Sequence, residues 1–355
     1  MSGPDRGPVG AGDGAAASPL LSVIIVTHGR HALLDACLAS LQAQDAMPGM
    51  ELLVCSHDDD GVAAVVLPRF PDAEIIPVDQ AHPGMARNLL IERARGDVLV
   101  FLDDDIELRP DFLTRLADNL TRFPEVSVFG GPNLTPPHST AFQVTQGAVL
   151  ASLVATGPVR RRYGNHPPQL ADERYFTLCN LAVRRADMPR FDPTLVCAEE
   201  NAAMAEMHDR GLLMRYDPEL VAYHERRGTY GSFCRQMFKY GKGRGQVLSD
   251  GAGPGALAHV APSLLLAYVA ASPALALALG IAWLGPLAVY AALVAAGAAK
   301  VALTLRRPGA APLAGALIVS LHACYGAGVP AGLLRGRRPT RTRPAPVGAG
   351  DPTTR

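Results

Sequence analysis

A long run without charge near the C-terminus limits how this chain can fold. Residues 251–299 contain no Asp, Glu, Lys or Arg, although these residues make up 19% of the chain. A soluble domain rarely sustains such a stretch, whereas the core of a bilayer requires one. Three apolar segments, residues 257–279, 281–303 and 313–334, each approach the roughly 20 residues with which a helix crosses hydrocarbon. We therefore expect two or three membrane helices within residues 251–335.

Arginines on both sides of the third segment bear on its orientation. Arg306 and Arg307 precede it, and Arg335 is the first of five arginines that follow it closely. Because positively charged loops stay on the cytoplasmic side, two crossings suit an N-terminal domain that faces the cytoplasm, whereas a third would carry the later arginines outside. We expect a cytoplasmic-membrane protein and leave the third segment open between a crossing, a re-entrant segment and an interfacial helix.

The residues before the apolar region predict one soluble domain. Residues 19–250 are long enough for a single substantial core. The Gly-, Ala- and Pro-rich residues 1–18 are expected to be a disordered tail instead of a signal peptide, and the basic residues 336–355 a second tail. With 33 acidic and 33 basic residues, the chain has no net charge that would favour nucleic acid as a partner. Its six cysteines lack zinc-ligand spacing.

Short β-branched apolar runs alternate with segments of helical periodicity in this domain. The expected strands are residues 20–27, 51–55, 74–78 and 97–102, and the expected helices are residues 33–44 and 84–95. Further on, residues 199–210 and 232–240 predict helices and residues 221–223 a strand. The alternation indicates an α/β fold with a mostly parallel sheet covered on both faces, and ligands of such sheets bind beyond the C-terminal strand ends.

Three consecutive acidic residues, Asp103, Asp104 and Asp105, directly follow the most hydrophobic expected strand. Adjacent carboxylates repel one another, and such a cluster usually persists where a cation compensates it. A few oxygen ligands suit Mg²⁺ or Mn²⁺ shared with substrate phosphates. A solvated acidic turn is the alternative, but the place at a strand end favours a metal site.

Four segments together resemble a known enzyme family. SVIIVTHGRHALLDACLASLQAQ and HPGMARNLLIERARGDVLVFLDDD resemble the opening half of family 2 glycosyltransferases, which have the GT-A fold, a Rossmann-like fold for nucleotide-diphospho-sugars. AEENAAMAEMHDRGLLMRYDPELVAYHERR and RQMFKYGKGRG resemble the membrane-anchored, exopolysaccharide-type members. The resemblance covers about residues 20–246 and implies a GT-A domain followed by transmembrane helices.

The resemblance implies roles for residues at the strand ends. Asp103 and Asp105 match the Asp-x-Asp pair that holds Mg²⁺ or Mn²⁺ on the donor, with Asp105 the more direct ligand. A divalent cation there stabilises the diphosphate that leaves the sugar. Asp104 in the middle position and Thr27 at the end of the first strand belong to the implied donor-binding site. Arg87 and Asn88 match a segment that frames the donor, so the resemblance places them in the same donor-binding site. Both residues also suit an ordinary polar helix face.

Glu199 and Glu200 match a Glu-Asp pair whose second member is the general base on the acceptor hydroxyl. Here the second member is Glu, which moves the carboxylate by about one methylene group, and catalytic geometry is sensitive on a scale of about 1 Å. We expect Glu200 to be the base, with Glu199 as the substitute. An acidic residue that only favours the first turn of a helix is the other reading.

Members of the family usually carry an acidic residue after the second strand, where it reads the nucleotide base. Here Ser56 and His57 stand at that place, with Asp58 and two further aspartates immediately after. Both Ser56 and Asp58 are therefore candidates for donor binding, and the base stays unassigned. A flexible acidic turn explains the three aspartates equally well.

Basic residues gather between His224 and Arg244, and Arg235 lies among them. Arg235 and Arg244 are candidates for binding the donor diphosphate, a lipid-linked diphosphate or anionic headgroups. A purely topological role, in which positive charge holds the domain on the cytoplasmic side, fits as well. His224, at the end of an expected strand before the cluster, is a candidate to approach the metal, but a lone His is more often structural or merely polar.

The sequence thus predicts an inverting glycosyltransferase that takes a nucleotide-sugar donor and a lipid-linked or surface-glycan acceptor. Too few crossings are present for the channel of a processive synthase. Two other classes remain: a different metal-dependent phosphate chemistry, such as nucleotidyl transfer or hydrolysis, and an inactive membrane-tethered sugar-binding protein.

Overall fold

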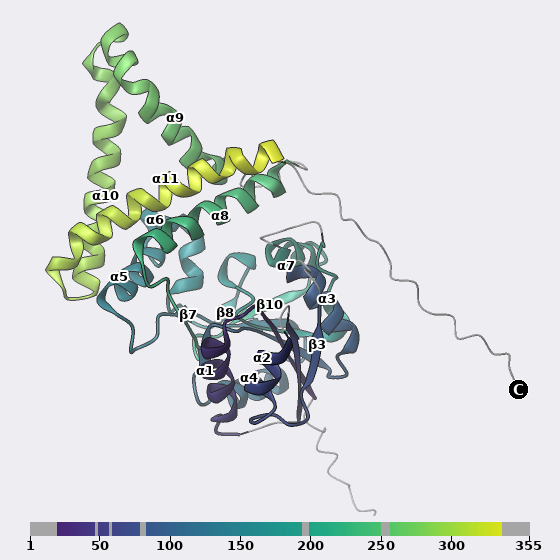
Figure 1. The fold of residues 1–355 in the computed structure, drawn as a ribbon. Coiled ribbons are helices and arrows are strands. Elements are labelled where there is room, and N and C mark those ends of the chain that lie inside the picture. Colours follow the sequence, from purple (N-terminus) through teal and green to yellow (C-terminus); the bar gives the residue numbers. More distant parts are fainter. Residues whose placement is uncertain are drawn as a thin grey trace, which may run out of the picture.

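The structure is a computed structural model of the chain. It describes residues 20–46, 49–56, 59–78, 83–193, 199–249 and 256–335. Figure 1 shows an α/β domain with a group of long helices on one side of it. The long helices belong to the apolar C-terminal part of the chain.

The first half of the domain is a parallel sheet with helices between its strands. Its elements are β1 (Leu21–Thr27), α1 (His31–Gln42), β2 (Met50–Ser56), α2 (Asp59–Val66), β3 (Glu74–Pro77), α3 (Pro83–Arg93) and β4 (Val98–Asp103). The strands lie in the order β3-β2-β1-β4, all parallel. All four predicted strands and both predicted helices are confirmed within a few residues. Helix α2 was not predicted, because its start was read as a flexible acidic turn.

The second half of the sheet is mixed, because β8 and β9 run against the other six strands of this sheet; the large sheet is still mostly parallel, as predicted. It contains β6 (Val126–Gly130), β8 (Gln169–Leu170), β9 (Asn180–Arg184) and β10 (Leu213–Tyr216). Strand β9 lies between β4 and β6 and is antiparallel to both. The reason is that the chain enters β9 at the end of the sheet where β4 finishes, with Asn180 beside Leu102.

A second, three-stranded sheet lies beyond the end of β4. It consists of β5 (Ile106–Leu108), β7 (Asn133–Leu134) and β11 (Ala222–His224), in the order β5-β11-β7. Strand β5 begins directly after the three aspartates, and β11 pairs with it antiparallel. The small sheet therefore brings residues around 224 next to the acidic cluster.

Two apolar layers hold the domain together, one on each face of the large sheet. Helices α1, α2 and α4 (Phe112–Arg122) cover one face, and α3 and α7 (Glu199–Asp209) cover the other. Each large apolar side chain that is fully buried, such as Leu38 or Phe101, contributes roughly 1.5–3 kcal/mol. The layers fix the strand ends from which the polar side chains project.

The C-terminal region is helical. Its elements are α8 (Tyr230–Leu248), α9 (Ala256–Leu279), η4 (Ile281–Leu284), α10 (Gly285–Thr304), η5 (Pro308–Ala310) and α11 (Ala311–Arg335). Two helices earlier in the chain, α5 (Ala141–Leu150) and α6 (Leu153–Thr156), lie between β7 and β8 in the sequence. Three segments in the described part are long and apolar enough to cross a membrane: Ala258–Leu279, Ile281–Thr304 and Pro308–Arg335. Helix α8 begins at a capping box of Thr229 and Ser232 and runs further than predicted.

Candidate active site

The acidic cluster lies where parallel strands end at one edge of the large sheet. Asp103 is the last residue of β4, and Thr27 is the last residue of the neighbouring strand β1. The Thr27 hydroxyl donates a hydrogen bond of 2.6 Å to Asp104. Asp104 is fully buried and Asp105 is 5% exposed, whereas Asp103 is only partly buried. The cluster is therefore built into the edge of the fold and is not an acidic turn in open solvent.

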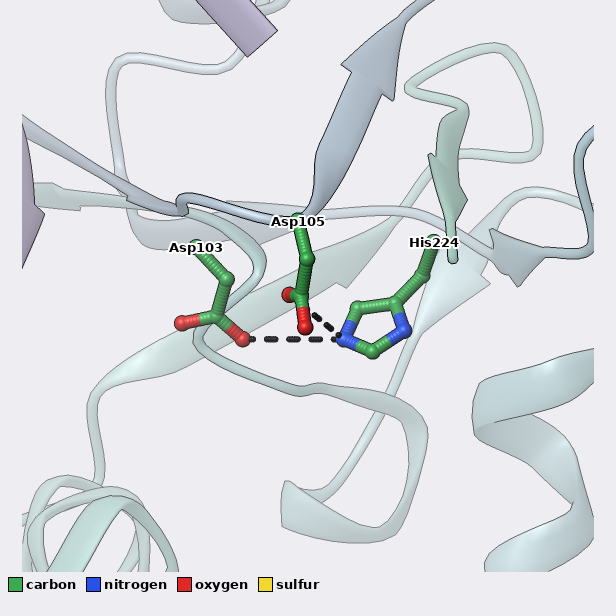
Figure 2. Close-up of side chains that lie close together, drawn as sticks. All are labelled: Asp103, Asp105 and His224. Carbon is green, nitrogen blue, oxygen red and sulfur yellow. Dashed lines mark ion pairs between the residues drawn. The ribbon is translucent and has the colours of Figure 1, made fainter. Parts of the chain in front are cut away.

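Three metal-ligating side chains converge at this edge (Figure 2). Asp103 and Asp105 flank the end of β4, and His224 closes β11, which pairs with β5 through Ile106. His224 Nε2 lies 3.2 Å from a carboxylate oxygen of Asp105 and 3.9 Å from one of Asp103. One ligand atom from each of the three residues lies within 4.8 Å of the other two. Burial lowers the pKa of His224, so its ring is available as a neutral ligand.

Arg30 is a functional candidate that the sequence analysis missed. Its guanidinium forms ion pairs with both Asp104 and Asp105, and its Nε lies 3.2 Å from Asp104. Arg30 is the third residue after the end of β1, and this place at the same sheet edge was the signal that could have identified it. Burial alone would raise the pKa of Asp105, but the permanent charges of Arg30 and Arg227 and the hydrogen bond from Arg30 hold it below the ordinary value.

Arg87 and Asn88, neighbours on α3, have different surroundings. Arg87 donates a 2.6 Å hydrogen bond to Glu199 and lies 3.6 Å from Asp103, so it joins the acidic cluster to the start of α7. Asn88 instead exchanges two hydrogen bonds with the backbone of Phe191, at 2.8 and 2.9 Å. In the structure Arg87 faces the site, while the Asn88 side chain fixes a loop beside it.

Glu199 and Glu200 form the first turn of α7 and differ in their surroundings. Glu199 is 4% exposed and paired with Arg87. Its pKa is raised by burial and by the adjacent Glu200. Glu200 is more exposed and accepts a 3.2 Å hydrogen bond from Asn201, and within the described residues it pairs with no basic side chain. Of these two carboxylates, Glu200 is thus the one that is partly open and without an ion pair among the described residues.

The remaining candidates occupy different places. Ser56 is buried at the end of β2, next to Thr27 on the sheet edge, whereas Asp58 lies outside the described residues. Arg235 is exposed on α8. Arg244 lies two to three turns further along α8, where it interacts with Tyr325 of α11. The structure therefore brings Ser56 to the same edge as Thr27, and Arg244 to the membrane helices.

Arg227 connects the acidic cluster to α8. Its guanidinium lies 3.9 Å from Asp105. Gln236 of α8 accepts hydrogen bonds from Arg227 at 3.2 Å and from the Tyr240 hydroxyl at 3.0 Å. Together with Arg30 and Arg87, Arg227 surrounds the carboxylates with three cations. Such a set of acidic metal ligands and basic side chains can hold a cation and a phosphate group side by side.

Comparison with known proteins agrees with this geometry. The family model for glycosyl transferase family 2 matches residues 22–180. The succinoglycan biosynthesis protein ExoM of Rhizobium meliloti (strain 1021) is 24% identical over 261 residues, which cover 65% of this chain and 75% of ExoM. A mannosyltransferase from Pyrobaculum calidifontis, PcManGT, solved in complex with GDP-Man and Mn²⁺, has a similar fold, with a TM-score of 0.57 and 18% identity over 88% of both chains.

The fold is thus of the GT-A type. The three aspartates at the sheet edge lie within the residues that the family model matches. The three apolar helices follow the matched segment towards the C-terminus. On these findings, residues 22–180 match the family model for glycosyl transferase family 2, and the three helices towards the C-terminus are long and apolar enough to anchor the protein in a membrane.

Proposed function

We propose that the chain transfers a sugar from a nucleotide-diphospho-sugar to a lipid-linked or glycan acceptor, with inversion at the anomeric carbon. The observation that carries the proposal is that the ligand atoms of Asp103, Asp105 and His224 lie close together. Three arginines, Arg30, Arg87 and Arg227, lie next to these carboxylates. The complex of PcManGT with GDP-Man and Mn²⁺ supports a nucleotide sugar as donor. The similarity to ExoM, a succinoglycan biosynthesis protein, supports a glycan product.

Asp103, Asp105 and His224 are the residues that would hold the divalent cation, Mg²⁺ or Mn²⁺. Two carboxylates and one neutral imidazole are a suitable donor set for such an ion, and their ligand atoms already lie close together. When bound, the cation supplies positive charge to the diphosphate that leaves the sugar. Asp104 would stay outside this set, because Thr27 and Arg30 occupy its oxygens.

The basic side chains would hold the donor diphosphate. Arg30, Arg87 and Arg227 already lie against the carboxylates, and guanidinium groups bind phosphate oxygens in pairs. Arg235 is a further candidate from the adjacent turn of α8. Thr27 and Ser56 would line the nucleotide end of the site, because they close β1 and β2. Asp58 stays a candidate for the same end.

Glu200 would be the general base. It removes the proton from an acceptor hydroxyl, whose oxygen then attacks the anomeric carbon from the side opposite to the diphosphate. The new glycosidic bond forms as the bond from the sugar to the diphosphate oxygen breaks. The surroundings support Glu200 over Glu199, because Arg87 occupies the Glu199 carboxylate in a buried ion pair. Glu199 would then position Arg87.

The acceptor would lie at the cytoplasmic surface of the membrane. The catalytic domain continues through α8 into the apolar helices, so a substrate carried by the same bilayer stays near the site. This supports a lipid-linked sugar or a growing surface glycan. The orientation with the domain in the cytoplasm follows from the supply of nucleotide sugars and from the arginines around α11.

Donor hydrolysis by the purified full-length protein in detergent tests the proposal. GDP- and UDP-sugars are supplied one at a time with Mn²⁺ or Mg²⁺, and the nucleoside products are separated. We expect metal-dependent release of nucleoside diphosphate. Release of nucleoside monophosphate instead would indicate a different phosphate chemistry. If a donor stabilises the protein in the presence of metal but none is turned over, the chain is an inactive binding protein; if no donor does either, the proposed donor site is refuted.

A further inference from the structure

Helices α8 and α11 run side by side in direct backbone contact. A methyl group at Gly241 of α8 would collide with the carbonyl oxygen of Tyr325, and one at Gly245 with that of Val329. From the other side, Gly328 and Gly332 of α11 meet the backbone of α8 in the same way. Because the contacts advance together along both helices, α8 and α11 are parallel over this stretch and must lie at the same depth relative to a membrane.

Helix α8 itself is not a membrane-crossing helix. It carries four basic residues and no acidic one: Arg235, Lys239, Lys242 and Arg244. A single Lys or Arg at the centre of a spanning helix is already costly. The start of α8 is also fixed to the catalytic domain, because its buried Phe233 and Met237 belong to one apolar cluster with Val149 and Leu150 of α5. Helix α8 therefore lies at the level of the domain surface.

The first half of α11 also packs on the catalytic domain. Its buried Ala314, Leu317 and Ile318 share the apolar cluster with α5, and His322 Nε2 lies 3.0 Å from the backbone oxygen of Val154. Protein thus covers α11 where it contacts α5, α6 and α8, and also where it contacts α9 and α10. Over an apolar stretch of 18 residues in each candidate span, 39% of the residues are buried for α11, against 6% for α9 and 17% for α10. A helix packed so extensively on the domain is not surrounded by lipid.

Helices α9 and α10 are less covered than α11, although the second half of α10 joins the same apolar cluster through Val294, Ala298 and Val301. They project from the α8–α11 pair on the side away from the catalytic domain and meet at η4, as the green part of Figure 1 shows. Large apolar side chains are fully open along them, with Leu277 89% and Ile281 80% exposed. These side chains need a nonpolar partner, and a single pair of open helices with apolar residues all around fits hydrocarbon.

We propose that only α9, η4 and α10 enter the bilayer, and that α8 and α11 lie together along its surface. The third apolar segment is then an interfacial helix in spite of its length. Arg306 and Arg307 at the start of α11 and Arg335 at its end fall on the same side as the catalytic domain, as positively charged residues prefer. The cationic residues of α8 face the headgroup layer, where anionic lipids attract them.

Reporter fusions to the full-length chain test this topology. Green fluorescent protein, which fluoresces inside the cell, and alkaline phosphatase, which is active outside it, are each fused before Met1 and after Arg355. We expect the two ends to report the same side, in protein that sediments with the membrane and resists carbonate. Ends that report opposite sides would mean that α11 crosses, and protein released by carbonate would mean that α9 and α10 are not embedded; both outcomes overturn the proposal.

A matched pair of substitutions tests the depth of α11 directly. Val269 in the middle of α9 and Val319 in the middle of α11 are both 43% exposed. We expect Val269→Lys to lower the amount of carbonate-resistant protein at least about tenfold, because a charge at the centre of a span opposes insertion. Val319→Lys should change it by less than about twofold, since a lysine at the surface reaches water. Equal losses, or no loss in either variant, would refute the inference.

Discussion

Arg87 is the clearest place to test how the site is held together. It is 14% exposed at its side chain and lies between Glu199, at 2.6 Å, and Asp103, at 3.6 Å. Replacing it with alanine leaves the Glu199 carboxylate, which is 4% exposed, without its partner. Breaking a buried pair by removing one member typically costs about 3–5 kcal/mol. We therefore expect Arg87→Ala to destabilise the whole domain as well as to impair donor binding.

The ability of Glu199 to take up a proton limits that cost. Neutralising a carboxyl with an ordinary pKa of 4.5 at pH 7 costs about 3.4 kcal/mol, which sets the upper bound at this pH. Because the folded pKa is already raised by burial, folding favours the protonated form, and the loss shrinks as the pH falls towards 4.5. At pH 5.5 the same bound is only about 1.4 kcal/mol. The destabilisation should thus be larger at pH 7 than at pH 5.5.

Thermal unfolding of the full-length protein in detergent, followed by circular dichroism, measures both effects. At pH 7 we expect Arg87→Ala to lower Tm by about 7–14 °C. Glu199→Gln alone should change Tm by only a few degrees, and combining it with Arg87→Ala should restore most of the loss, because no buried charge then remains. Strictly additive losses in the double variant, or a loss that is the same at both pH values, would refute the argument that burial of an unpaired Glu199 is the cause.

Three further substitutions probe the metal, the base and the helix contact. Asp105→Asn should abolish stabilisation by Mn²⁺ in the presence of nucleoside diphosphate, measured as a shift in Tm. Glu200→Gln should leave this stabilisation intact but lower turnover by at least about a hundredfold, and equal loss of donor affinity in both variants would contradict the assigned roles. Gly245→Ala should force α8 and α11 apart and lower Tm, because the added methyl group would meet the α11 backbone. The control Gly231→Ala on the same helix should leave Tm unchanged, since only the end of the Arg235 side chain is near. Equal changes in Tm would argue against tight packing of the two helices.

Much of the first half of the fold was predictable because its signals are local. Each strand from β1 to β4 is a short apolar run that reads as buried without any knowledge of its neighbours. The antiparallel insertion of β9 was not predictable in the same way. Its direction depends on where the preceding residues, from α5 onwards, have already placed the chain, and the sequence of β9 itself carries no sign of that.

The candidate site divides along the same line. Asp103, Asp104 and Asp105 were found because three carboxylates directly after the most hydrophobic strand are conspicuous in the sequence alone. Arg30 was missed because an arginine in a loop is common, and its significance arises only from Asp104, which lies 74 residues away in the chain. Likewise, the length and hydropathy of α11 indicate a membrane helix when its sequence is considered alone. Its glycines indicate close helix packing only once α8, more than 80 residues earlier, is known to lie against them.

The connection from β11 to α8 has a consequence for the acceptor. His224 ends β11, Glu225 donates its backbone N–H to the carbonyl oxygen of Asp105 at 2.9 Å, and Thr229 caps α8. Buried Arg226 fixes this short segment by donating to the carbonyl oxygen of Asn133 at 2.7 Å. The metal ligands and the helix at the proposed membrane surface are therefore joined by a few well-held residues, without a flexible linker. With α8 at the proposed membrane surface, a rigid joint of this kind would set the height of the site above the bilayer. The proposed lipid-linked acceptor would then be selected by how far its sugar extends from the headgroup as well as by the identity of that sugar.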